Sequence, residues 1–328
     1  MLDPQANGLL KLMLEYGVPA VNTQTPTEAR HAYLSRKSFS QPDPLPVARV
    51  SDHLVDLGTH ALKIREYRPQ SAHALRQGHQ GEQLSPALIY FHGGGWTIGD
   101  IDTHDVLCRA LTESAGCAVF SVDYRLGPEA PFPAAFEDAL SAFQWLEARS
   151  KDEAFGIDRS RIALGGDSAG GNLAAAACLA LKDSPIRPCF QLLIYPATDM
   201  LCTHPSHAKR GKGYLLTRQA IEWFRGNYMP DPKTYADWRA SPLLAPSHEG
   251  LPPALIVLAG FDPLHDEGLA YANKLSASQV PVQVVNFARQ IHGFITMGRI
   301  LDEANTAVDL CASVLRSAFV KKLEGQPS

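Results

Sequence analysis

Short apolar runs alternate with longer segments of helical periodicity between about residue 85 and residue 320. The apolar runs that predict buried strands cover residues 87–91, 118–123, 161–165, 190–195, 254–259 and 282–287. The segments that predict helices cover residues 103–114, 133–149, 169–182, 267–278 and 302–323. This alternation is typical of repeated βαβ units around a mostly parallel sheet with helices on its faces. The sequence therefore predicts an α/β fold.

An additional strand is predicted upstream, over residues 61–68. The polar segment that joins it to the strand at residues 87–91 is rich in His, Gly and Gln. We expect this segment to be a surface hairpin connection between the two strands.

Two stretches, residues 1–45 and 200–245, break the alternation. In the first, Leu9 and Met13 fall at helical spacing, and in the second Ile221 and Phe224 mark one face of a helix that begins near Thr217. Neither stretch has enough apolar residues to fold alone. They are either additional packing layers or a helical cap over the carboxyl end of the sheet, where open α/β folds bind ligands. We expect a cap, formed by residues 1–45 and 200–245, over a core formed by residues 46–199 and 246–328.

Composition narrows the class of protein. With 45% hydrophobic and 20% charged residues, the 328-residue chain is neither a disordered chain nor a fibrous one. The net charge is −4 and no Lys/Arg-rich block occurs, which argues against nucleic acid or an anionic membrane as the partner. The six cysteines lack a C-x-x-C spacing, so we expect them to be reduced and buried. Without a secretory signal or a long apolar run, the protein is expected to be cytoplasmic.

The string GDSAG at residues 166–170 matches G-x-S-x-G. It follows a predicted strand directly and precedes the Ala-rich predicted helix. In this setting the flanking glycines leave room for a strained turn that projects the Oγ of Ser168 from the sheet edge as a nucleophile. The alternative is a glycine-rich turn with an incidental serine.

The string HGGGW at residues 92–96 follows the predicted strand at residues 87–91. The backbone N–H groups of Gly93, Gly94 and Gly95 can point into a cavity because no Cβ obstructs them. Together with the N–H of Ala169, they are suited to hold the anionic oxygen of a tetrahedral intermediate. Neither string has the glycine spacing or the GK[ST] ending of a phosphate loop, so no nucleotide site is expected.

A serine nucleophile needs a histidine base and an acid that orients it. In this fold class the chain order is Ser, acid, His. Of the histidines after Ser168, only His292 comes just after the last predicted strand. The favoured acid is Asp262, which lies just beyond the strand at residues 254–259. Its rivals Asp266 and Glu267 lie where a helix begins and are better explained by the helix dipole.

These strings, with VDYRLGPE at residues 122–129, LIYP at 193–196, DPL at 262–264, DEG at 266–268 and HGF at 292–294, resemble the bacterial hormone-sensitive-lipase-like esterases of the α/β-hydrolase fold. The resemblance spans about residues 60–320. It implies that Ser168 is the nucleophile, Asp262 the acid and His292 the base, with Gly94 the foremost oxyanion donor. It also implies a helical cap, and the mechanism needs no metal or organic cofactor.

Two positions depart from the family pattern. Gly127 stands where the family usually has Ala, and His265 stands where it usually has Arg. Neither residue belongs to the implied triad.

The expected substrate is a small-molecule ester with a short or medium acyl chain. The residues expected to line a closed apolar pocket are Trp96, Tyr195, Tyr214, Leu215, Trp223 and Phe224. An amidase, deacetylase or peptidase remains an alternative, because the triad specifies acyl transfer and not the leaving group. A receptor that has lost catalysis is the other alternative, and the intact triad argues against it. Two oligomeric states stay open: a monomer, and a homodimer formed through the edge strand near residues 282–287.

Overall fold

An eight-stranded sheet forms the centre of the computed structural model, which describes residues 1–70 and 84–324. The strand order is β1-β2-β4-β3-β5-β6-β7-β8. The strands are β1 (Arg49–Asp56), β2 (Ala61–Arg68), β3 (Ser85–Phe91), β4 (Ala118–Asp123), β5 (Ile157–Asp167), β6 (Gln191–Ile194), β7 (Ala254–Phe261) and β8 (Val282–Ile291). Strands β1 and β2 pair antiparallel, and β2 pairs antiparallel with β4, whereas all pairs from β4 to β8 are parallel. The predicted α/β fold with a mostly parallel sheet is confirmed.

The structure corrects the sequence prediction at the antiparallel end of the sheet. Strand β1 was not predicted, because only Val55 of its residues is buried while Val50 and Leu54 are exposed, so its apolar signal is weak. The hairpin expected between β2 and β3 is wrong, because β4 lies between these two strands. Residues 71–83 of the connection lie outside the described part of the chain.

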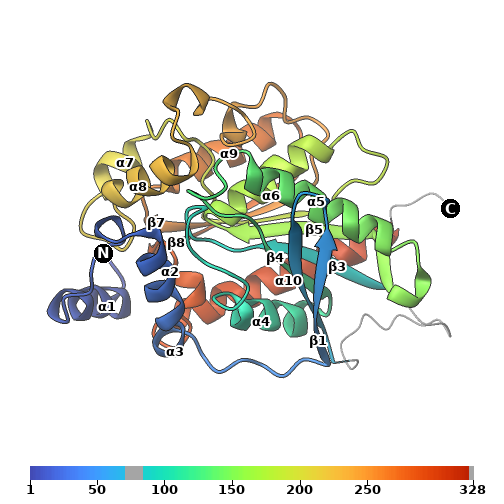
Figure 1. Cartoon of the computed structure of the whole chain (residues 1–328), viewed down its shortest axis with the longest axis horizontal. Helices are drawn as coiled ribbons and strands as arrows, with labels where there is room; N and C mark the ends of the chain where they lie inside the picture. The colour runs from blue at the N-terminus through green and yellow to red at the C-terminus, as the bar shows by residue number, and fades with distance from the viewer. Residues whose placement is uncertain (71–83, 325–328) are drawn as a thin grey trace.

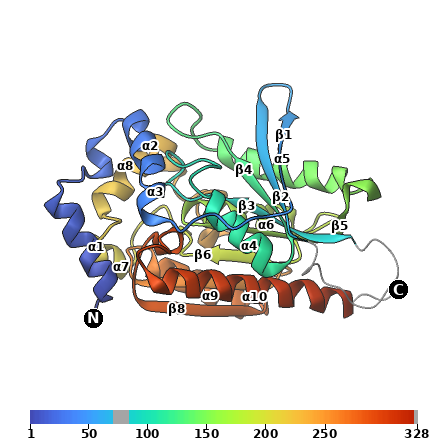
Figure 2. The same cartoon turned by 90° about the horizontal axis from the view of Figure 1, so that it is seen from below.

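Helices cover both faces of the sheet (Figures 1 and 2). Helices α4 (Asp105–Ala115) and α10 (Asp302–Glu324) lie on one face, and α5 (Ala134–Arg149), α6 (Ala169–Leu181) and α9 (His265–Ala277) lie on the other. Strand β3 shows why two cores form: Ile89 and Phe91 pack into one cluster, while Leu88 and Tyr90 pack into the opposite one. All five helices predicted from the sequence are present, with ends displaced by a residue or two.

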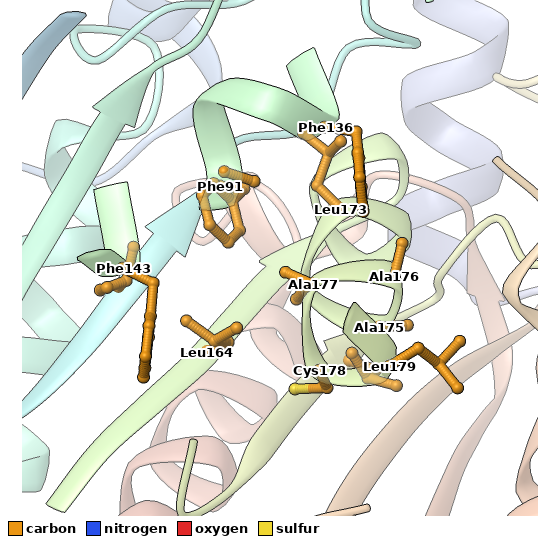
Figure 3. Close-up of a cluster of buried hydrophobic side chains, with 14 of the residues drawn as sticks. Phe91, Phe136, Phe143, Leu164, Leu173, Ala175, Ala176, Ala177, Cys178 and Leu179 are labelled. Carbon is orange, nitrogen blue, oxygen red and sulfur yellow. The ribbon is translucent and has the colours of Figure 1, made fainter. Parts of the chain in front are cut away.

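Helix α6 packs closely on the sheet (Figure 3). Its residues Ala174 to Ala177 are fully buried, and small side chains let the helix approach the strands. Leu164 of β5, Phe91 of β3 and Phe143 of α5 fill the space around it. This packing holds the first turn of α6, which begins directly after Ser168, in a fixed position at the end of β5.

The two stretches that break the βαβ pattern lie together at one end of the sheet in both views (Figures 1 and 2). The first forms α1 (Pro4–Glu15), α2 (Pro26–Ser35) and α3 (Lys37–Ser40), and the second forms α7 (Pro205–Arg210) and α8 (Arg218–Tyr228). As predicted, α8 begins after Thr217, whose hydroxyl accepts a hydrogen bond from the Ala220 N–H. Single 3-10 turns lie at Val21–Thr23, Glu153–Phe155, Pro232–Thr234, Pro242–Leu244 and Phe294–Thr296.

Two further expectations concern cysteines and membranes. Four of the six cysteines are buried as expected, whereas Cys189 and Cys202 are only half-buried. Among the described residues, none of the helices combines the length and the apolar character that crossing a bilayer would require.

Candidate active site

Ser168 sits on a strained turn between β5 and α6. Its φ of 56° and ψ of −115° lie in a region that side-chain-bearing residues rarely adopt. A Cβ at Gly166 or Gly170 would overlap the carbonyl oxygen of Phe91, so both glycines of the pentapeptide are required sterically. The Ser168 N–H donates to the Ile194 carbonyl at 2.8 Å, which ties the turn to β6. The turn is therefore held by its surroundings, as a projecting nucleophile needs.

Three side chains from separate parts of the chain form a continuous hydrogen-bonded series. His292 Nε2 lies 2.9 Å from Ser168 Oγ, and His292 Nδ1 lies 2.7 Å from Asp262 Oδ2. The other Asp262 oxygen accepts a hydrogen bond from the Leu264 N–H at 2.8 Å. Asp262 is fully buried, and 8% of the His292 surface is exposed. The carboxylate holds the proton on Nδ1, which leaves Nε2 free to accept the serine proton.

The rival histidines and acids are engaged elsewhere. His207 Nε2 lies 2.7 Å from Glu267 Oε2, and His265 Nδ1 lies 2.8 Å from Asp266 Oδ1. His248 Nε2 is 2.9 Å from the Pro242 carbonyl oxygen. Both Asp266 and Glu267 lie in the first turn of α9, as expected. In the described part of the chain, His292 is the histidine that contacts Ser168.

Strand β3 is followed by residues 92–96, here called the glycine loop, in which Gly94 has φ +129° and Gly95 has φ +55°. A Cβ at Gly94 would overlap the Ile98 carbonyl oxygen, and one at Gly95 would overlap the Phe224 ring. No hydrogen bond recorded among the described residues uses the N–H of Gly94 or Gly95, and both residues line a cavity beside Ser168. The N–H of Ala169 is in the first turn of α6, where such groups have no partner within the helix.

The oxyanion role expected of Gly93 is not supported by its hydrogen bond in the structure. Its N–H was expected to be an oxyanion donor, but it donates to Asp167 Oδ1 at 2.9 Å instead. This role of Asp167 was not predicted, although the residue stands in the GDSAG string. Its carboxylate also accepts a hydrogen bond from the Tyr90 hydroxyl at 2.8 Å and lies 3.2 Å from His104 Nε2. Burial alone would raise the Asp167 pKa, but His104 and Tyr90 more than offset burial, so the pKa is lowered.

His92 stabilises the same loop. Its ring stacks on Tyr124 with centroids 4.3 Å apart, and its Nδ1 lies 2.8 Å from the Gly93 carbonyl oxygen. Complete burial lowers the pKa of His92 to about 4, with a further contribution from nearby His104. His92 is therefore a neutral ring at physiological pH.

A cavity of about 430 Å³ opens at Ser168 and His292. Four of the residues expected to line a pocket, Trp96, Tyr214, Leu215 and Phe224, stand in its wall. Tyr195 does not line the cavity. It is buried, and its ring packs against the His292 imidazole with centroids 4.6 Å apart. Trp223 is also absent from the wall and packs edge-on against Phe224.

The N-terminal helices supply cavity residues that were not predicted from the sequence. Leu10 and Met13 of α1 line the cavity, as do Ala29, Tyr33 and Arg36. The last three are spaced by four and three residues, so they share one face of α2 and the turn that follows it. That spacing was visible in the sequence, but without a known partner surface it does not show which face is covered.

Known proteins with similar sequences and structures are hydrolases of the same fold. A family model described as the alpha/beta hydrolase fold matches residues 88–296. The chain is 38% identical over 322 residues to the carboxylic ester hydrolase LipN of Mycobacterium tuberculosis, covering 96% of this chain and 83% of that protein. It is 39% identical over 300 residues to the ethyl acetate hydrolase of Pseudomonas putida, covering 89% and 92% respectively.

A solved structure with the same architecture is the ester hydrolase EH1AB1 from the metagenome of Lake Arreo. It matches with a TM-score of 0.91 and 40% identity, over 98% of this chain and 100% of that one. The matched family model, the level of identity and the sheet order agree with the motifs of the sequence. This chain belongs to the hormone-sensitive-lipase-like esterases of the α/β-hydrolase fold.

Proposed function

We propose that this protein is a serine carboxylesterase that hydrolyses short- to medium-chain acyl esters through an acyl-enzyme intermediate. The observation that carries the proposal is the hydrogen-bonded series from Ser168 through His292 to Asp262, at the wall of a cavity. The names of two relatives, a carboxylic ester hydrolase and an ethyl acetate hydrolase, support the ester as the substrate class.

The proposed reaction has two acyl-transfer steps. His292 Nε2 takes the proton of Ser168 as Oγ attacks the ester carbonyl carbon, and Asp262 stabilises the imidazolium that forms. The N–H groups of Gly94, Gly95 and Ala169 bind the developing oxyanion. The tetrahedral intermediate collapses when His292 returns the proton to the leaving alcohol. A water molecule then attacks the acyl-enzyme by the same route and releases the acid.

We propose that α1–α3 and α7–α8 are the cap that sets the substrate size. Leu10, Met13, Tyr214, Leu215 and Phe224 from these segments supply much of the apolar cavity wall. An apolar acyl chain enclosed by them is removed from water, which favours binding by about 0.8 kcal/mol per buried CH₂ group. A cavity of about 430 Å³ lies in the size range of sites that bind small molecules, and we propose that short and medium acyl chains fill it.

The test compares 4-nitrophenyl butyrate and hexanoate with a long-chain triglyceride emulsion. We expect rapid turnover of the two short esters and slow turnover of the emulsion. The Ser168→Ala variant should fold normally and lose nearly all ester turnover, since Ser168 is the hydroxyl that His292 contacts among the described residues. Faster hydrolysis of the emulsion would refute the size limit, and an active Ser168→Ala variant would refute the mechanism.

A further inference from the structure

Arg36 follows α2 and brings a positive charge to the cavity wall. It is half-buried and shares a face with Tyr33, which also lines the cavity. Within residues 1–70 and 84–320, no hydrogen bond or ion pair joins its guanidinium to another group. Burial lowers the pKa of Arg36, and Tyr33 only partly offsets the effect. A guanidinium stays charged in any case, so the fold holds an uncompensated cation beside the substrate space.

The carboxylates of the same cavity are already engaged. Asp167 bonds to Tyr90 and Gly93, as described above. Asp199 accepts the Leu201 N–H at 2.9 Å and lies 3.4 Å from His204 Nε2. Glu267 accepts the Thr198 N–H at 2.7 Å and pairs with His207. These side chains are fixed by their own partners and do not neutralise Arg36.

The second cavity cation, Arg225, differs from Arg36 in its surroundings. Its Nη1 donates to the Met200 carbonyl oxygen at 2.8 Å. Its guanidinium also lies 4.4 Å from the ring centroid of Tyr235. Arg225 is therefore held against the cap, whereas the five N–H donors of Arg36 are available to a ligand.

We propose that Arg36 recognises an anionic group on the substrate, so that this esterase prefers esters carrying a carboxylate over neutral esters of the same length. This inference rests on the proposed function. Arg36 forms a charge-assisted hydrogen bond to the substrate carboxylate, and the apolar wall around it strengthens the attraction. The reacting ester still lies at Ser168, and Arg36 takes no part in proton transfer. Arg36 is thus a specificity residue.

A purely structural role for Arg36 makes a different prediction. A cation after the last turn of a helix is favoured by the helix dipole, and its aliphatic stem can cover apolar surface. If this were its whole role, replacement would lower the melting temperature of the protein without changing the preference between charged and neutral esters. The preference ratio therefore separates the two explanations.

The test uses two pairs of esters, because the carboxylate can sit on either side of the ester bond. One pair is 4-nitrophenyl hydrogen adipate and 4-nitrophenyl hexanoate, and the other is 4-carboxyphenyl butyrate and phenyl butyrate. In at least one pair, Arg36→Gln should lower kcat/KM for the charged ester at least ~10-fold relative to the neutral one, mainly through KM. Arg36→Lys should recover part of the loss, and added salt should shrink the wild-type preference.

The matched control is Lys37→Gln, which removes the same charge at the next residue, outside the cavity wall. It should leave both ratios within about twofold of the wild type. The proposal is overturned if Arg36→Gln changes neither ratio, or if Lys37→Gln changes them as much. A wild-type protein that hydrolyses none of the four esters would instead refute the proposed carboxylesterase function.

Discussion

At the residue scale, the site depends on contacts that a motif does not reveal. The string HGGGW contains three glycine N–H groups, but the first of them, that of Gly93, donates its hydrogen bond to Asp167 and so is not available to an oxyanion. The position of Tyr195 was likewise not predictable, because its place behind His292 depends on how β6 and the loop after β8 meet. Ser168, Asp262 and His292 were predictable individually, since each follows a recognisable strand.

A prediction at this scale concerns Asp123, at the end of β4. Burial raises its pKa to about 6, and repulsion from Asp100 adds to the effect. The folded state therefore binds more protons than the unfolded state between about pH 4 and pH 6, so the wild-type free energy of unfolding falls as the pH rises through that window. Asparagine does not ionise, so Asp123→Asn removes the destabilisation that comes from the charged carboxylate. The variant should have a free energy of unfolding higher than that of the wild type at pH 8, by on the order of 1–2 kcal/mol.

Urea unfolding at pH 8 and pH 4 measures this difference. The gain from Asp123→Asn should shrink toward zero at pH 4, where the wild-type carboxyl is protonated. The exposed Asp183 serves as the control, and Asp183→Asn should change the free energy of unfolding little at either pH. A difference that stays constant with pH, or a less stable Asp123→Asn variant at pH 8, contradicts the explanation.

At the scale of elements, the apolar runs predicted strands β2 to β8, and helical periodicity predicted the main helices. Strands β3 to β7 were predictable because strands buried on both faces appear as continuous apolar runs. Strand β8 was expected to be buried, but it lies at the edge of the sheet and most of its residues are exposed or half-buried. The apolar pattern failed for β1, an edge strand whose exposed Val50 and Leu54 mimic a surface segment. The pairing of β2 with β4 also depends on the whole sheet, so no local pattern near residues 69–84 indicates it.

A prediction at this scale concerns the contact between α8 and the glycine loop. Tyr228 is fully buried and stacks on Trp96 with ring centroids 4.8 Å apart. Its hydroxyl has no hydrogen-bond partner within the described residues. Tyr228→Phe removes only this unpaired hydroxyl and should keep or slightly raise the free energy of unfolding. Tyr228→Ala leaves a cavity and should lower that free energy by about 3–5 kcal/mol.

Chemical denaturation of the two variants, with turnover of 4-nitrophenyl butyrate, checks this prediction. We expect Tyr228→Phe to keep wild-type activity. Tyr228→Ala should lose activity as well as stability, because Trp96 directly follows Gly95 in the loop. Equal stability of the two variants would show that the stacked rings contribute nothing.

At the scale of the whole molecule, the cavity is assembled from both ends and the middle of the chain. Helices α1 and α2, the glycine loop, the segment before α8 and the loop after β8 all contribute to its wall. The sequence predicted that the two irregular stretches cover the sheet end, but not which side chains face inward. Arg36 illustrates the limit, because its importance follows only from which other cavity charges already have partners.

The central claim is that Ser168 is the nucleophile that His292 activates. The direct measurement is labelling with the organophosphate diethyl 4-nitrophenyl phosphate, followed by mass mapping of the modified peptide. The account predicts one phosphoryl group per chain on Ser168, loss of ester turnover in step with labelling, and no labelling of the Ser168→Ala variant. Labelling at a different residue, or an esterase that stays active once Ser168 is modified, would contradict it.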